Sequence, residues 1–356
     1  MAQSFVYVGC RTTKERDARG KGIAAYEIDA KSSEWHYKGT CPAGENPSFL
    51  IVSKKHQRLY AVHGDGATVS SFRLNPWSGI PEYEETINCH GENPVHLCLD
   101  RRESNLLIVN YASGNIARIV LDTQGRFSDS SVLISLPEVS GPHKIEQRSS
   151  HPHFIGRIAN NGFDTDWYVI PDKGSDAVYA MNFSNNTVKA IISGKSRESA
   201  APRHAVMHPF RSFIYIVNEL DSTLTTWKFD PDGQQLTPVH TLSVIPAQRH
   251  ELTRASGIAI TEDGEAIYIS NRGDDSVSII HIDPMNGFPQ SVNWISSNGN
   301  FPRFLCLTKD SKYLYVANER SDSIVQYAVN KDKTLTLTGQ VIETGSPVCL
   351  AFYQSN

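Results

Sequence analysis

The sequence predicts an all-β fold, a seven-bladed β-propeller built from four-stranded blades. Three observations predict it. A short strand that opens with proline recurs seven times along the 356 residues, and a second apolar strand follows all but the last copy. The repeats are spaced by roughly 45–58 residues, which is typical of propeller blades. The chain also begins in the middle of one repeat and ends at the start of another, which favours a single domain over residues 1–356.

The opening strands share the pattern Pro-x-x-apolar-x-apolar, in which alternate side chains point to opposite faces of a sheet. The fifth copy is degenerate, because alanine replaces the proline. The copies begin at Pro47, Pro94, Pro152, Pro202, Ala255, Pro302 and Pro347.

The second strands are β-branched and aromatic runs, which favour buried strands. They cover residues 59–62, 106–110, 167–170, 214–218, 267–271 and 314–318. A polar turn then leads to a third strand, such as 223–227 or 276–280, and a more variable fourth strand follows.

The two ends of the chain complement each other. Residues 5–9 form a second-type strand without its opening strand, and residues 347–352 form an opening strand without its second strand. We therefore expect the N- and C-terminal strands to pair within one blade, which closes the ring and removes an exposed sheet edge. Two insertions interrupt the repeats, a charged loop at 11–21 and a longer connection at 137–150. Long loops on a rigid scaffold are often functional, although a charged run is also typical of a solvated surface.

Composition excludes several classes of partner and cofactor. The formal net charge of −4 provides no basic surface for nucleic acid. No apolar run approaches the ~18 residues that a membrane span needs, and the early run at 5–9 is too short for a signal peptide. We expect a cytoplasmic protein that binds no membrane; the oligomeric state is not readable from the sequence.

The six cysteines do not have the spacing of a metal site, a haem site or a disulfide framework. Cys98, Cys306 and Cys349 alternate with leucine or valine in predicted strands, so we expect reduced core thiols. The glycine and serine motifs of nucleotide-binding proteins and serine hydrolases are also missing. The sequence therefore predicts no cofactor and no metal.

Ionisable residues recur where the strands of a blade begin or end, and in a propeller such positions gather at one end of the central channel. Those near the opening of a first strand are His96, His151, His153, Arg203, His204, Arg254 and Arg303. Those at the close of a second strand include Asn110, Glu219, Arg272 and Glu319. Arginine binds carboxylate or phosphate through two parallel hydrogen bonds, and histidine or glutamate can move a proton. The set suits a small anionic ligand.

A structural role is the alternative for many of these residues. Asn110, Asn271 and Asn318 precede turns, where asparagine tolerates a left-handed backbone, and aspartates such as Asp172 cap turns. His153, Arg203, Glu219 and Arg272 differ, because other residue types occupy the equivalent positions of other blades. A requirement of the scaffold would repeat in every blade. These four are therefore the predicted catalytic residues.

The chain resembles the lactonase family of seven-bladed propellers, whose named activity is 6-phosphogluconolactonase and which includes the fungal 3-carboxy-cis,cis-muconate lactonizing enzyme. The resemblance runs nearly end to end and is carried by the segments 46–50, 151–153, 202–204, 217–220, 270–276 and 347–349. The active site proposed for that family implies the same four residues, His153, Arg203, Glu219 and Arg272. The sequence departs from the family pattern at Val62-His63-Gly64 and in the longer basic loop after Gly9.

We expect a hydrolase that opens a sugar-acid lactone. Glu219 would act as general base, Arg203 and Arg272 would hold the substrate anion and the developing oxyanion, and His153 would transfer a proton. His96, Asn110, His151, His204, Arg254, Arg303 and Glu319 would bind the substrate. The first alternative is a cycloisomerase acting on a muconate-type polycarboxylate. The second is a non-catalytic propeller that binds a protein, which the converging charges argue against.

Overall fold

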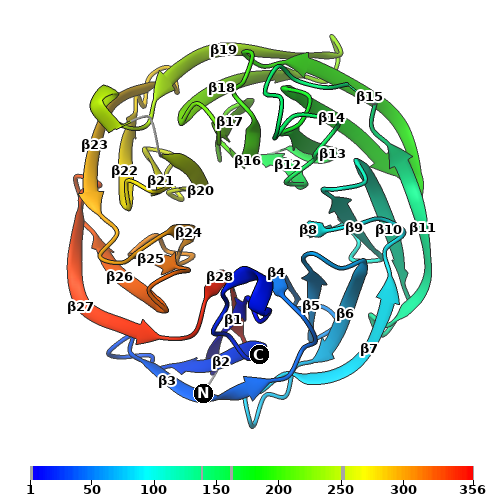
Figure 1. The fold of residues 1–356 in the computed structure, drawn as a ribbon, viewed down its shortest axis with the longest axis vertical. Helices are drawn as coiled ribbons and strands as arrows, with labels where there is room; N and C mark the ends of the chain where they lie inside the picture. The colour runs from blue at the N-terminus through cyan, green and yellow to red at the C-terminus, as the bar shows by residue number, and fades with distance from the viewer. Residues whose placement is uncertain (1–2, 138, 161–162, 250–252, 356) are drawn as a thin grey trace. The chain divides into compact units, whose positions relative to one another are not determined.

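The computed structural model describes residues 3–137, 139–160, 163–249 and 253–355. The strands of this part form seven four-stranded sheets (Figure 1). Two short 3-10 helices are present, η1 (Lys14–Arg16) and η2 (Ala247–Arg249). In the residues described, no helix has the length and apolar character needed to cross a membrane. The chain divides into two compact units, and the single domain over 1–356 stays a prediction.

Unit 1 comprises residues 1–136, 319–324 and 340–356. Its three sheets have the strand orders β28-β1-β2-β3, β4-β5-β6-β7 and β11-β10-β9-β8. The strands are β1 (Ser4–Cys10), β2 (Ile23–Ile28), β3 (Trp35–Cys41), β4 (Pro47–Ser53), β5 (Arg58–His63), β6 (Thr68–Arg73), β7 (Glu82–Asn88), β8 (Pro94–Leu99), β9 (Asn105–Asn110), β10 (Asn115–Leu121), β11 (Phe127–Ser135) and β28 (Pro347–Gln354).

The predicted pairing of the chain ends is confirmed. Strand β1 lies antiparallel to β28, with Val8 opposite Leu350 and Tyr7 opposite Ala351. In Figure 1 the first strand, in blue, and the last strand, in red, lie side by side. One sheet of unit 1 is therefore assembled from both ends of the chain.

The charged loop at 11–21 is tied to unit 1 by ion pairs. The Arg11 side chain is buried and lies 3.2 Å from Asp65 and 3.5 Å from Glu319. Arg19 pairs with Asp322 at 2.5 Å, and Arg16 also pairs with Asp65. The loop is thus more than a solvated run of charges, because its first arginine is part of the packed interior.

Unit 2 comprises residues 137–318 and 325–339. It holds the sheets β12-β13-β14-β15, β16-β17-β18-β19 and β20-β21-β22-β23, and most of β24-β25-β26-β27. The strands are β12 (Gly156–Asn160), β13 (Phe163–Asp172), β14 (Ala177–Ser184), β15 (Thr187–Lys195), β16 (Pro202–Met207), β17 (Phe213–Asn218), β18 (Thr223–Asp230), β19 (Gln235–Ser243), β20 (Arg254–Ile260), β21 (Ala266–Arg272), β22 (Ser276–Ile282), β23 (Pro289–Ser296), β24 (Pro302–Leu307), β25 (Tyr313–Asn318), β26 (Ser323–Val329) and β27 (Leu335–Glu343).

One opening strand differs from the prediction. The strand expected at 152–155 begins at Gly156, and only an isolated bridge joins Pro152 to Asp172. The backbone still bonds across this stretch, because His153 N donates to Pro171 O at 3.1 Å and Lys173 N donates to His151 O at 3.0 Å. The proline does not account for the difference, because Pro202 and Pro302 begin regular strands at the equivalent position. Here the Asp172 carboxylate accepts hydrogen bonds from His151 N at 2.7 Å and from Ser150 Oγ at 2.5 Å, in place of a continuous backbone ladder.

The core of unit 2 lies between neighbouring sheets. One buried cluster joins β12–β15 to β16–β19 around the fully buried Trp227, and another joins β16–β19 to β20–β23 around Ile267 and Ile269. The second strand of a sheet, such as β17, is buried on both faces because a sheet packs on each side of it. This packing fixes the ends of the second strands, where the candidate site residues lie.

Candidate active site

The register within each sheet explains how ionisable residues reach one edge. The repeat's opening position lies opposite the asparagine that ends or nearly ends the second strand: Pro202 opposite Asn218, Ala255 opposite Asn271, and Pro302 opposite Asn318. The register then shifts, so the residue after the opening position is left out of the ladder. Such bulges redirect a side chain and are frequent beside active sites.

Two sets of equivalent positions follow from this register in unit 2. The residues after the opening position are His153, Arg203, Ser256 and Arg303. The residues after the terminal Asp or Asn of the second strand are Lys173, Glu219 and Arg272. Sequentially distant residues therefore occupy the same edge of successive sheets.

The Glu219 carboxylate is the centre of the site and is held by three cations. Its Oε2 lies 2.9 Å from Arg203 Nε and 3.1 Å from Arg272 Nη2, and its Oε1 lies 2.9 Å from Lys173 Nζ. The side chains of Glu219 and Arg203 are 8% and 2% exposed. Burial alone would raise the pKa of Glu219, but Arg272, Lys173 and Arg203 outweigh it and hold this pKa well below its ordinary value. The carboxylate is therefore ionised across the physiological range.

The arginines crowd one another and are fixed by further contacts. Burial and the neighbouring Arg272 lower the pKa of Arg203, while Glu219 opposes that shift. Arg203 Nη1 donates to Ser256 O at 2.9 Å. The guanidinium of Arg272 lies 5.4 Å from the ring centroid of Phe301, within the range of a cation–π contact. Both guanidinium groups are thus pre-positioned before any ligand binds.

The His153 imidazole is buried beside this cluster. Its ring centroid lies 5.3 Å from that of His204, which in turn lies 5.5 Å from Phe154. Burial and the nearby Arg203 hold the pKa of His153 well below 6.5. The imidazole is therefore neutral at pH 7, the form that can accept a proton.

The outer side of the site is formed by the predicted residue Arg254 together with Lys173 and Glu146, which the sequence did not predict. Lys173 Nζ lies 2.7 Å from Glu146 Oε2, and Glu146 Oε1 lies 3.2 Å from Arg254 Nη2. Lys173 could have been found by aligning the repeats, because it follows Asp172 as Glu219 follows Asn218. Glu146 lies in the 137–150 insertion, and the only sequence signal for it was that this insertion interrupts the repeats.

The remaining predicted residues of unit 2 lie near the cluster or support it. His204 and Arg254 make the contacts given above, and Arg303 lowers the pKa of both His153 and Arg203. His151 N donates to Asp172 Oδ1 at 2.7 Å, and Gly174 N donates to the same oxygen at 2.9 Å, which confirms the turn-capping role expected for Asp172.

The other three predicted residues belong to unit 1. The His96 ring is buried against Phe49, with centroids 3.8 Å apart. The Asn110 amide is fully buried and donates to Cys89 O and to Asn115 Oδ1, so its donors serve the sheet and not a ligand. Glu319 pairs with Arg11.

The left-handed turn conformation considered for Asn110, Asn271 and Asn318 is wrong. None of them has a positive φ angle, and each is the last or next-to-last residue of a strand. Their buried amides instead form hydrogen bonds with nearby residues. Asn271, for example, donates to Ser276 Oγ and Ser278 Oγ of the next strand, β22. A buried amide needs such partners because an unsatisfied polar group is costly.

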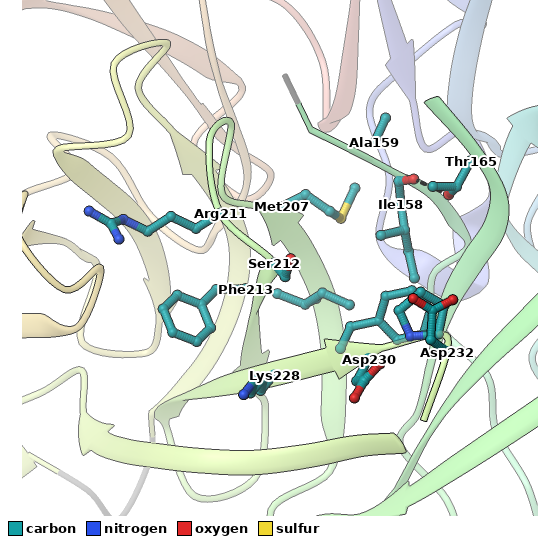
Figure 2. A pocket seen from close by; sticks show the side chains of 13 residues that line it. Ile158, Ala159, Thr165, Met207, Arg211, Ser212, Phe213, Lys228, Asp230 and Asp232 are labelled. Atoms are coloured by element: carbon teal, nitrogen blue, oxygen red, sulfur yellow. Dashed lines mark hydrogen bonds between the residues drawn. The ribbon is translucent and has the colours of Figure 1, made fainter. Parts of the chain in front are cut away.

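A separate cavity of about 310 Å³ lies at the opposite end of β16 and β17 (Figure 2). Met207 ends β16 and Phe213 begins β17, and both line this cavity, whereas Arg203 and Glu219 lie at the other ends of the same strands. Apolar side chains such as Ile158, Met207 and Phe229 line it together with Arg211, Lys228 and two aspartates. The ionisable groups of the candidate site do not contribute to it.

All six cysteines are thiols in the structure. Of the three predicted core thiols, Cys349 is buried and burial raises its pKa to about 12, whereas Cys98 and Cys306 are only partly buried. Among the described residues, no group of three or more His, Cys, Asp or Glu side chains is placed to hold a metal ion.

Comparison with known proteins identifies relatives over the whole length of the chain. A 6-phosphogluconolactonase from Bacillus subtilis is 24% identical over 356 residues, covering 99% of both chains. A 6-phosphogluconolactonase from Formosa agariphila is 25% identical and covers 99% of this chain and 100% of its own. The structure of a periplasmic gluconolactonase from Pseudomonas aeruginosa superposes with a TM-score of 0.89 at 22% identity, covering 99% of this chain and 100% of that one.

The family described as "Lactonase, 7-bladed beta-propeller" matches residues 5–352. This match, together with seven four-stranded sheets, confirms the all-β propeller class predicted from the repeats. The chain belongs to the lactonase family of seven-bladed β-propellers.

Proposed function

We propose that this chain is a lactone hydrolase that opens a sugar-acid lactone, as the names of its 6-phosphogluconolactonase relatives suggest. The observation that carries the proposal is the buried cluster of Arg203, Arg272 and Lys173 around one carboxylate, next to a neutral His153. Such a cluster suits a reaction in which an oxyanion develops and a proton moves.

The geometry favours a division of roles that differs from the one expected from sequence. Both oxygens of the Glu219 carboxylate are engaged by cations, Oε1 by Lys173 and Oε2 by Arg203 and Arg272, which argues against a role in accepting the proton of water. We assign that role to His153, whose neutral imidazole is the proton-accepting form. Glu219 acts as a positioning residue that holds Arg203, Arg272 and Lys173.

In the proposed reaction, a water molecule attacks the lactone carbonyl carbon and passes a proton to His153. Arg272 and Arg203 stabilise the negative charge that develops on the carbonyl oxygen. The bond between the carbonyl carbon and the ring oxygen then breaks, and the proton held by His153 is delivered to the departing ring oxygen. The product is an open-chain hydroxy acid.

The test is a panel of lactones assayed by acid release: a phosphorylated aldonolactone, its unphosphorylated counterpart and a muconolactone. We expect enzyme-dependent opening of an aldonolactone. His153→Ala should lower kcat roughly 10²–10⁴-fold, the usual contribution of general acid–base catalysis. Full activity of that variant would remove His153 from the mechanism, and no opening of any aldonolactone would overturn the proposal.

A further inference from the structure

On the solvent side of the site, the Glu146 carboxylate bridges two cations, as the anionic group of a ligand would. Its two carboxylate oxygens are divided between two cations, with Oε2 at 2.7 Å from Lys173 Nζ and Oε1 at 3.2 Å from Arg254 Nη2. A phosphate or a carboxylate of a ligand would bridge two cations in the same manner. The cationic pair is therefore already shaped to hold an anionic group.

Exposure changes steadily from the centre of the site outward. The side chains of Arg203 and Lys173 are 2% and 7% exposed, whereas those of Glu146 and Arg254 are 29% and 38% exposed. Glu146 thus lies on the side of Lys173 that solvent reaches, and Glu219 lies on the buried side. An anion that approaches Lys173 from solvent meets Glu146 first.

The backbone beside Glu146 is anchored independently of its side chain. Gln147, 1% exposed, donates to Lys173 O at 2.9 Å and to Asp176 Oδ1 at 2.7 Å, and Glu146 N donates to His143 Nδ1 at 3.2 Å. The carboxylate can therefore leave the cations by a rotation of its own side chain, while Gln147 keeps the segment in place.

The charges of the cluster favour the arrival of an anion. Lys173, Arg203, Arg254, Arg272 and Arg303 are cationic. In the part of the chain that the structure describes, Glu146 pairs with Lys173 and Arg254, and Glu219 pairs with Lys173, Arg203 and Arg272. Glu219 contacts three of these cations and is buried, so it is not the group that a ligand would replace. Glu146 contacts two of them and is the more exposed carboxylate.

We infer that Lys173 and Arg254 form a subsite for a phosphate or carboxylate group of the substrate, and that Glu146 is an internal anion which the incoming group displaces. The inference deepens the proposed function, on which it rests for the identity of the substrate. Glu146 thereby sets the affinity for anionic ligands, because every ligand anion competes with it for the same two cations.

The test measures binding of inorganic phosphate by calorimetry, which does not depend on turnover. Glu146→Gln removes the competing charge and should tighten phosphate binding roughly 3- to 10-fold, the scale expected for partly exposed ion pairs. Arg254→Gln should weaken it several-fold. Glu262→Gln, at an exposed glutamate of the same unit, is the matched control and should leave binding at the wild-type value.

Weaker or unchanged phosphate binding by Glu146→Gln would overturn the displacement, and wild-type binding by Arg254→Gln would overturn the subsite. Repeating the titrations with 6-phosphogluconate and with gluconate separates a phosphate from a carboxylate. If the subsite holds a phosphate, Glu146→Gln should tighten binding of 6-phosphogluconate but not of gluconate. If it holds a carboxylate, binding of gluconate should tighten as well. Tightened phosphate binding in a protein that opens no lactone would support the subsite while contradicting the proposed function.

Discussion

Replacing Glu219 by glutamine keeps the size of the side chain and removes one negative charge from the buried cluster. Lys173 retains Glu146 as a partner, but among the described residues neither Arg203 nor Arg272 has a second carboxylate within ion-pair distance. The two arginine side chains are 2% and 7% exposed, so solvent screens them little. Leaving such charges uncompensated in the interior costs about 3–5 kcal/mol.

The assay is urea unfolding of the wild type, Glu219→Gln and the exposed control Glu262→Gln at pH 7. With a slope near 3 kcal/mol/M, the loss corresponds to a midpoint lowered by roughly 1 to 2 M. The control should unfold with the wild type. An unchanged or raised midpoint for Glu219→Gln would show that the carboxylate does not hold the cations together.

The same variant predicts a pH dependence of defined sign. The pKa of Glu219 is lowered in the folded protein from its ordinary value of 4.5, so its contribution to the free energy of unfolding is fully present above pH 4.5. That contribution is lost as the pH falls toward the folded pKa, because the unfolded chain then binds a proton that the folded chain does not. The difference between wild type and Glu219→Gln should therefore shrink below pH 4.5.

Two further predictions concern the His153 imidazole and the buried cysteine thiols. Because burial and Arg203 hold the pKa of His153 well below 6.5, the acid limb of the kcat/KM profile should lie below pH 6.5; a limb at or above that value would mean that another group titrates. Burial raises the pKa of Cys10, Cys89 and Cys349 to about 12, so these thiols should react with Ellman's reagent only after unfolding, and rapid labelling of any of them in the native protein would contradict their burial.

The strand pattern could be predicted from the sequence because each repeat satisfies the same packing rule. The second strands are buried on both faces, and their sequences are continuous apolar runs. The repeat at the N-terminus lacks its opening strand and the repeat at the C-terminus lacks its second strand, so each provides the strand that the other lacks. The exception is 152–155, where an isolated bridge and hydrogen bonds to the Asp172 side chain stand in place of a strand.

The candidate site was predictable to the extent that it follows the repeats. His153, Arg203, Glu219 and Arg272 stand at repeating positions whose residue types do not repeat uniformly, although Arg303 and Glu319 match Arg203 and Glu219. The structure brings Arg203, Glu219 and Arg272 within ion-pair distance. Lys173 was missed because the predicted strand ends at residue 170, whereas the observed strand extends to Asp172 and places Lys173 directly after its end.

Two features of the site could not be predicted from the sequence. The contact between Glu146 and Lys173 depends on the path of an insertion outside the repeats, which Gln147 anchors through contacts distant in sequence. The number of cations around Glu219, and hence the direction of its pKa shift, also depends on side-chain positions that a strand pattern does not determine.

The central claim is that water opens a lactone at this site, and solvent-isotope incorporation tests it most directly. Turnover of the lactone substrate in H₂¹⁸O should place one ¹⁸O atom in the product carboxylate at a rate above the uncatalysed background, and His153→Ala should lose that excess. Turnover without ¹⁸O incorporation would instead indicate an intramolecular cycloisomerase and would contradict hydrolysis.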